Sequence, residues 1–275
     1  MAVISGIAGA VNGSNTVRKW SINYTADTKA YNASNTLGAT GRLAGNKDWT
    51  GSYEAYGHTP AVKAGASFSF VGSINGTLGC TGTAIVDQVV ITWPIEDGGP
   101  ISHVVSFSGN SALVKGSAAA TDATVPSPPS AIGTKVQLGT LVATPVYTEL
   151  LEVRSITLTF TASNQSYVSS TTAGVVKRTK GNIDATLAIE VYCDGGFAGL
   201  PDVNAVNAVR IFVNATLFWE ILWIMFSENS GLEVDVEGAA VVGATINGAL
   251  NMFTLIAAAQ TAGSIKDPAG VSYLA

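Results

Sequence analysis

An internal repeat constrains this chain more than any other feature. When residue n is set beside residue n + 136 over positions 30–56, 11 of the 27 positions are identical without a gap, whereas unrelated stretches of this composition would share roughly two. A period of half the chain indicates two similar domains, not the stack of short units found in a solenoid. The identical pairs are Tyr31/Tyr167, Ser34/Ser170, Thr36/Thr172, Gly38/Gly174, Arg42/Arg178, Gly45/Gly181, Asn46/Asn182, Asp48/Asp184, Thr50/Thr186, Glu54/Glu190 and Tyr56/Tyr192.

The repeat continues outside this window when small shifts are allowed. Upstream, Trp20–Ile22 aligns with Arg154–Ile156, and downstream Phe107–Gly109 aligns with Ile246–Gly248. Between the copies, residues 117–134 are rich in Ala, Pro, Ser and Thr, a composition that favours an extended connector. We therefore expect a first domain over 1–134, which includes the linker 117–134, and a second domain over 135–275.

Short runs of Val, Ile, Thr, Phe and Tyr separated by Gly, Asn and Ser predict a mainly β protein. With 47% apolar and 12% charged residues, the chain can bury a sizeable core. The expected fold is two tandem antiparallel β-sandwich or barrel domains. Residues 148–153 and 204–213 also fit a helical period, so one short helix in each domain stays open. The apolar run Ile211–Phe226 contains Asn214 and Glu220 and is short for a membrane span, which favours buried strands and no membrane insertion.

The supply of groups for catalysis is small. His58 and His103 have no counterparts in the other copy, and Cys80 and Cys193 do not occupy equivalent positions. The sequence contains no nucleophile elbow, zinc-protease motif, phosphate-binding loop or CxxC pair. We therefore expect no enzyme activity, no cofactor and no metal. The formal net charge of −5, from 14 basic and 19 acidic residues, argues against tight nucleic-acid binding.

Three alternating acids occur near the end of the second copy. Glu233, Asp235 and Glu237 would share one face of a strand, where their like charges require solvent or a basic partner. Paired carboxylates are also the catalytic groups of glycosidases. Without a partner motif, a solvated acidic wall is the favoured interpretation.

The two copies differ in how much of each strand face they keep. Around Gly45–Gly57, one alternate set is Trp49, Gly51, Tyr53 and Ala55, and in the second copy it becomes Ala185, Leu187, Ile189 and Val191. Such exchanges are what a repacked interior tolerates. The opposite set, positions 48, 50, 52, 54 and 56, is identical at four of five positions. Both domains therefore present this polar face to the same surroundings, as they would in a ring of three chains with six equivalent places.

The sequence resembles bacteriophage tail tube proteins, in a version with two tube domains in one chain. The resemblance covers nearly the whole chain through the duplication. It rests on diffuse motifs: Trp20–Tyr24 (WSINY), Gly45–Trp49 (GNKDW), Pro60, Phe68–Val71 (FSFV), and Val104–Phe107 (VVSF) with Gly109 and Leu113.

This resemblance implies β-sandwich domains whose sheets join around a lumen, with rings stacked through loops and an extended hairpin. Family tubes are usually hexamers of single domains, so the duplication points to homotrimers. The implied partners are other copies of the chain, the tape measure, the tail terminator, and tip or baseplate proteins. Double-stranded DNA would pass without specific binding. The implied location is the virion tail, assembled in the host bacterial cytoplasm.

The acidic residues of the retained face are the candidates for the lumen, since like charge would keep DNA from adhering. An ion pair between subunits is the competing role for any of them. Other virion components remain alternatives, either a capsid decoration protein or a tail tip or baseplate component, and so does a carbohydrate-binding β-sandwich. The lumen candidates are Asp48, Glu54, Asp184, Glu190, Glu233, Asp235 and Glu237. The intersubunit candidates are Arg42, Arg178, Lys180, Tyr56 and Tyr192.

Overall fold

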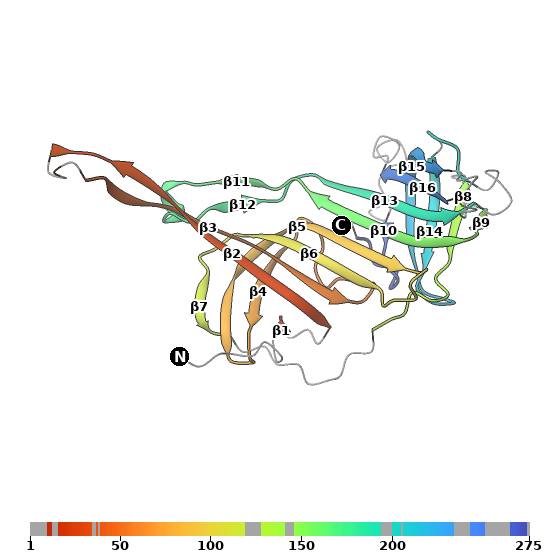
Figure 1. Ribbon diagram of the computed structural model, residues 1–275, viewed down its shortest axis with the longest axis horizontal. Helices are drawn as coiled ribbons and strands as arrows, with labels where there is room; N and C mark the ends of the chain where they lie inside the picture. The colour runs from red at the N-terminus through yellow and green to blue at the C-terminus, as the bar shows by residue number, and fades with distance from the viewer. Residues whose placement is uncertain are drawn as a thin grey trace.

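The structure, a computed structural model, is built almost entirely of antiparallel β-strands (Figure 1). It describes residues 10–12, 16–34, 37, 39–118, 128–140, 146–193, 200–204, 206–233, 243–250 and 265–273. Within these residues no α-helix occurs, and Ser170–Thr172 form a single 3₁₀ turn. The mainly β, antiparallel fold class expected from the sequence is confirmed.

Seventeen strands are assigned in chain order. In the first half they are β1 (Ala10–Val11), β2 (Val17–Tyr31), β3 (Gly41–Tyr56), β4 (Ser67–Ser73), β5 (Leu78–Pro94), β6 (Ser102–Gly109) and β7 (Val114–Ser117). In the second half they are β8 (Val136–Thr140), β9 (Tyr147–Leu150), β10 (Val153–Ala162), β11 (Gln165–Tyr167), β12 (Lys177–Thr179), β13 (Ile183–Tyr192), β14 (Val206–Phe212), β15 (Phe218–Glu233), β16 (Gly243–Leu250) and β17 (Ile265–Lys266).

One continuous sheet runs through both halves. Its order is β2-β3-β6-β5-β10-β13-β16-β15-β14-β8-β9, so β5 of the first half pairs directly with β10 of the second. Seven residue pairs make this junction, from Ser155 opposite Pro94 to Thr161 opposite Gln88. The expected division at residue 134/135 stays a prediction, because the pairing is continuous across the two halves.

Strand pairing repeats between the halves with a defined register. Lys19 lies opposite Glu54 as Ser155 lies opposite Glu190, so the shift of 136 residues holds throughout β2 and β10. Trp20 therefore corresponds to Ile156, and the expected alignment of Trp20–Ile22 with Arg154–Ile156 is two residues out of register. The expected alignment of β6 with β16 is also displaced, since Phe107 corresponds to Gly248.

The longest strands also repeat, at a shift of 140 residues. β5 is irregular between Val86 and Gln88, and β15 is irregular between Phe226 and Glu228. A β-bulge at the same place in both strands bends them alike. β15 is therefore the counterpart of β5, as β2 is the counterpart of β10.

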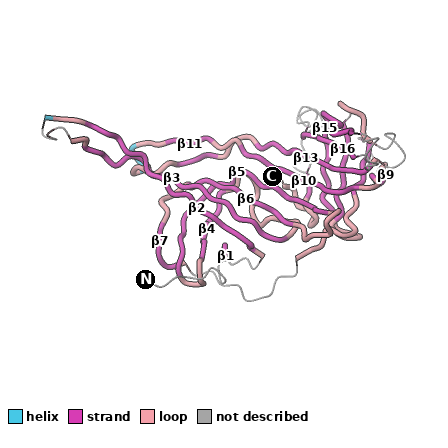
Figure 2. Tube along the Cα trace, viewed as in Figure 1, coloured by secondary structure: helices cyan, strands magenta, loops and turns pink. Residues whose placement is uncertain are grey.

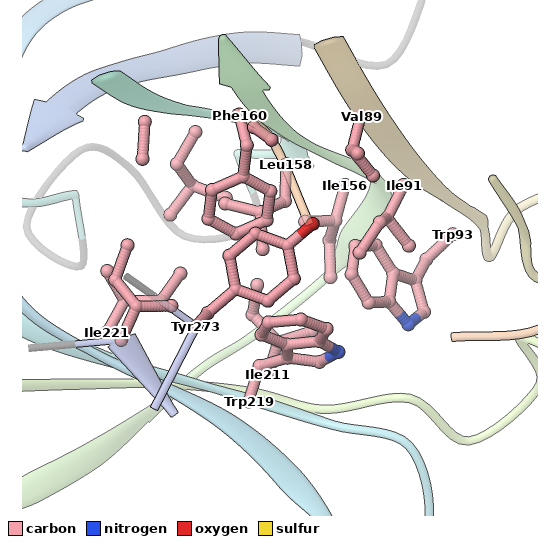
Figure 3. Packing of buried hydrophobic residues seen from close by; sticks show 14 of the residues in the cluster. Val89, Ile91, Trp93, Ile156, Leu158, Phe160, Ile211, Trp219, Ile221 and Tyr273 are labelled. Atoms are coloured by element: carbon pink, nitrogen blue, oxygen red, sulfur yellow. The ribbon is translucent and has the colours of Figure 1, made fainter. Parts of the chain in front are cut away.

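The buried side of the sheet forms one hydrophobic cluster that draws on both halves. Phe160 from β10 stacks on Tyr273 at a centroid distance of 4.0 Å, and Trp219 from β15 packs against both rings (Figure 3). The indole nitrogen of Trp219 donates to the carbonyl oxygen of His58 in the first half at 3.0 Å. The apolar run Ile211–Phe226 supplies buried strand residues, as expected. Residues 148–153 and 204–213 carry β9 and β14 where a helix had been the alternative.

Two hairpin arms leave the sheet on the same side of the molecule (Figure 1, Figure 2). The first is the distal part of β2 and β3, and the second is β11–β12 with its 3₁₀ turn. Both arms need glycine at their base. A Cβ at Gly45 would lie 2.6 Å from the Asp27 carbonyl oxygen, and one at Gly181 would lie 1.8 Å from that of Ser163. The identical pair Gly45/Gly181 therefore has a steric cause in the approach of the two strands.

Candidate functional site

The predicted alternation of β3 and β13 is confirmed. Trp49, Tyr53 and Ala55 are buried in β3, and Ala185, Leu187, Ile189 and Val191 are buried in β13. Trp49 also donates its indole hydrogen to the Ser111 carbonyl oxygen at 2.7 Å and packs against Phe70 and Phe107. The opposite face of each strand is partly or fully exposed. The retained residues therefore lie on the solvent side of the sheet.

This polar face carries two shallow hollows at equivalent places. The first has a volume of about 320 Å³ and the second about 270 Å³. Eight of nine lining positions correspond through the strand pairing of β2, β3 and β6 with β10, β13 and β16. Hydroxyl and amide side chains dominate both hollows, so the face is polar and carries few charges. The first is lined by Ser21, Asn23, Thr50, Gly51, Ser52, Asp87, Ser106, Phe107 and Ser108, and the second by Thr157, Thr159, Thr186, Leu187, Ala188, Ser227, Asn247, Gly248 and Ala249.

An ion pair joins the two halves beside the β5–β10 junction. The guanidinium of Arg178 donates to both carboxylate oxygens of Asp48, at 2.9 and 2.6 Å, and to the Gly109 carbonyl oxygen at 2.5 Å. The Arg178 side chain is only 11% exposed. Paired, charge-assisted bonds of this kind fix orientation as well as adding stability. Arg178 was expected to contact another subunit, but here it binds the first half of its own chain.

The arm that carries Arg178 docks along β3. Lys47 donates its backbone N–H to the Gly174 carbonyl oxygen at 2.7 Å, and Val176 donates to that of Lys47 at 3.1 Å. Asn110 accepts at its side-chain oxygen from the Arg178 N–H at 2.7 Å, and its carbonyl oxygen accepts from the Lys177 ammonium. The second arm is therefore held by backbone and side-chain bonds to the first half.

A second polar cluster crosses the junction at the other end of β10. Arg154 forms an ion pair with Glu96 at 2.6 Å and stacks on the Tyr192 ring at 4.4 Å, while the Tyr192 hydroxyl also donates to Glu96. Hydrogen bonds from Tyr192 and Arg154 hold the pKa of Glu96 below its usual range. The same carboxylate raises the pKa of Tyr192. Tyr192 therefore lies at the contact between halves of one chain.

The first half contains the counterpart of this cluster without a partner from another half. Arg18, at n − 136 from Arg154, stacks on Tyr56 at 5.1 Å and forms an ion pair with Glu54 at 2.5 Å. Sequence reasoning overlooked the pair Arg18/Arg154 because its alignment was two residues out of register there. Direct pairing of charges at the unshifted spacing would have revealed it.

The remaining acidic candidates lie at different places. Asp184 and Glu190 are exposed on β13, and Glu190 accepts a hydrogen bond from the Ser155 hydroxyl at 2.8 Å. Glu233 ends β15, whereas Asp235 and Glu237 lie outside the described residues. The acidic wall is therefore partly neutralised by ion pairs at positions 48 and 54.

The basic candidates also separate. Lys180 is exposed beside Gly65 of the first half. Arg42 is exposed on the first arm and forms no ion pair with any residue that the structure describes.

No cluster of metal-binding side chains is found in the described part of the chain. His103 is buried, which lowers its pKa, and its Nδ1–H donates to the Gly57 carbonyl oxygen at 3.0 Å. Burial also lowers the pKa of His58. Among the described residues, no helix has the length and apolar character to cross a membrane.

Comparison with known proteins gives no relative: the chain matches no protein-family model and no curated protein.

Proposed function

We propose that this protein is a structural virion component whose copies join head to tail into rings, and that the rings stack into the tail tube of a bacteriophage. The ring would contain three chains and six equivalent places, one for each half of each chain. Its role is mechanical, with no chemistry and no cofactor.

The β5–β10 junction is the observation that carries this proposal. It is one complete copy of the contact that a ring of six halves would need, formed within a single chain. The two strands that would repeat it lie at opposite ends of the pairing. β2 is an outer strand of the sheet, and residues 228–233 of β15 pair only with β16 among the described residues. Exposed strand edges of this kind are templates for pairing with another chain.

The register of the proposed contact follows from the two shifts. Val90 lies opposite Thr159 in the internal junction. Val90 corresponds to Ser230, and Thr159 corresponds to Asn23, through their pairing with β6, β16, β3 and β13. Asn23 of one copy would therefore lie opposite Ser230 of the next. Because different surfaces meet in this contact, it generates a ring when the rotation closes.

The duplicated polar face supports a channel wall. It presents hydroxyl and amide groups in two equivalent hollows, and two of its retained acids, Asp48 and Glu54, are in ion pairs. A duplex carries dense negative charge, and tight binding requires many unpaired Lys and Arg contacts. A wall without such a cluster would let double-stranded DNA pass during ejection. Tape measure, terminator and tip proteins would be the further partners, and assembly would occur in the bacterial cytoplasm.

Electron microscopy of the purified protein at high concentration tests this function, with native mass measurement of the smallest assembled unit. The expected result is hollow tubes with a regular ring repeat, built from units of three chains. Closed rings that never stack would favour a capsid decoration or tail tip component. A monomer at every concentration that binds glycans would favour a carbohydrate-binding module and overturn the proposal.

A further inference from the structure

We propose that Asp184 of one chain and Arg42 of the next copy form, between chains, the ion pair that Asp48 and Arg178 form within a chain. The inference rests on the proposed ring, because it names the side chains that would fix neighbouring copies in register. The partner is a second copy of this chain, and the surface is the first hairpin arm against the start of β13.

The two aspartates have the same local geometry. Oδ1 of Asp48 accepts a hydrogen bond from the Trp49 N–H at 2.8 Å, and Oδ1 of Asp184 accepts one from the Ala185 N–H at 2.8 Å. Each also lies opposite a threonine in the neighbouring strand, Thr25 for Asp48 and Thr161 for Asp184. The backbone therefore orients both carboxylates alike. Asp48 has its guanidinium partner, whereas Asp184 forms no ion pair within the described part of the chain.

The two arms also have the same local structure. Leu37 and Ala173 both adopt φ of 49°, in the left-handed region that side chains other than glycine rarely enter. Tyr31 faces Gly41 at the end of the first arm, as Tyr167 faces Lys177 in the second. An unusual conformation retained at equivalent positions implies that both arm tips are shaped for the same task. In the second arm, that task is docking on the neighbouring half.

The exposed arm has the composition of a contact that is not yet made. Leu37 is 96% exposed and Leu43 is 59% exposed, and Arg42 lies beside Leu43 without an ion pair among the described residues. In the docked arm, Thr172 is buried and Arg178 is largely covered. Docking of the first arm on the next copy would cover these apolar side chains and bring Arg42 to Asp184.

A charge exchange tests the pair. We expect R42D and D184R each to raise the protein concentration needed for ring formation by at least about tenfold, because each places like charges together at a covered contact. The double variant R42D/D184R restores the opposite charges between copies and should assemble within about threefold of the wild-type concentration. Analytical ultracentrifugation measures the threshold, and circular dichroism checks that each chain is folded.

The internal pair supplies the matched control. D48R repeats the substitution D184R at the equivalent position and should lower the unfolding temperature of the isolated chain, because Asp48 has its partner within that chain. D184R should leave the unfolding temperature unchanged and affect assembly alone. A destabilised D184R monomer would show that Asp184 acts within its own chain and would overturn the proposal.

Mixing the single variants tests the number of places as well. R42D and D184R chains complement each other only when they alternate, because each contact then has one acid and one base. A ring of three chains cannot alternate throughout, so the mixture should form short open chains and no closed rings. Closed rings from the mixture would indicate an even number of chains.

Two failures can be told apart. If wild-type rings form and both single variants assemble at the wild-type threshold, or if the double variant is folded but does not recover, the ion pair is wrong and the ring stands. If the wild-type protein forms no rings at all, the proposed function fails and the pair fails with it.

Discussion

The two hairpin arms share their tip geometry but not their surroundings. The second arm lies along β3, bonded through Lys47, Asn110 and Asp48, whereas the first arm is exposed over most of its length (Figure 1). Both retain the glycine at the base and the left-handed residue at the tip. The comparison shows that the arm is a docking element, and that a single chain provides a docking surface for only one of its two arms.

Removal of each arm should have opposite effects. We expect replacement of residues 27–46 by an Asn-Gly turn, which joins β2 to β3 directly, to abolish assembly and leave the fold of the chain intact. Replacement of residues 163–182 in the same way removes the bonds to Lys47, Asp48 and Asn110, so it should lower the unfolding temperature. Light scattering measures the first effect and thermal unfolding the second. Assembly that survives loss of the first arm would show that the arm has another role.

Single arginine substitutions should reproduce the contrast on a smaller scale. R178A leaves Asp48 without its guanidinium and should reduce the free energy of unfolding by about 2 to 3 kcal/mol, as expected for a hydrogen bond to a charged group. R42A, at the equivalent position, changes an exposed side chain and should cost less than about 0.5 kcal/mol in the isolated chain. Urea unfolding of the two variants measures both values. Equal losses would contradict the assignment of Arg42 to a contact between chains.

The pH dependence of stability should differ between the halves, with a smaller effect still. Burial lowers the pKa of His103, whose counterpart in the second half is Ala244. Because the unfolded histidine binds its proton more readily, stability is fully present above the unfolded pKa near 6.5 and falls as the pH drops toward the folded value. H103Q should flatten this loss between pH 7 and pH 5 when thermal unfolding is followed. An unchanged profile would assign the loss to His58 or to carboxylates.

The sequence predicts the elements of this fold better than their connections. The alternation of Trp49, Tyr53 and Ala55, and the repeat itself, follow from periodicity and identity over 27 positions. The junction of β5 with β10 could not be predicted, because parts of the chain more than 60 residues apart meet there through backbone bonds that any side chains permit. The two-residue error at Trp20 has the same origin, since apolar matches alone do not fix strand register.

The candidate site was predicted in part. Asp48 and Arg178 were both singled out, because identity at n + 136 marks residues whose surroundings are the same in both halves. Their contact with each other was not predicted, since the repeat does not say which residue of one half meets which of the other. Arg18 and Arg154 were missed for want of the correct register.

A disulfide cross-link tests the central claim most directly, namely that copies join by repeating the internal β5–β10 junction. In a background with Cys80 and Cys193 replaced by serine, V90C/T159C should form a bond within one chain and leave its mass on a denaturing gel unchanged. N23C/S230C should instead give covalent species that end at three chains. Covalent trimer with N23C/S230C, and none with the misaligned N23C/E228C, is the result that the account predicts. Monomer alone, from protein that cross-links in the V90C/T159C control, would contradict it.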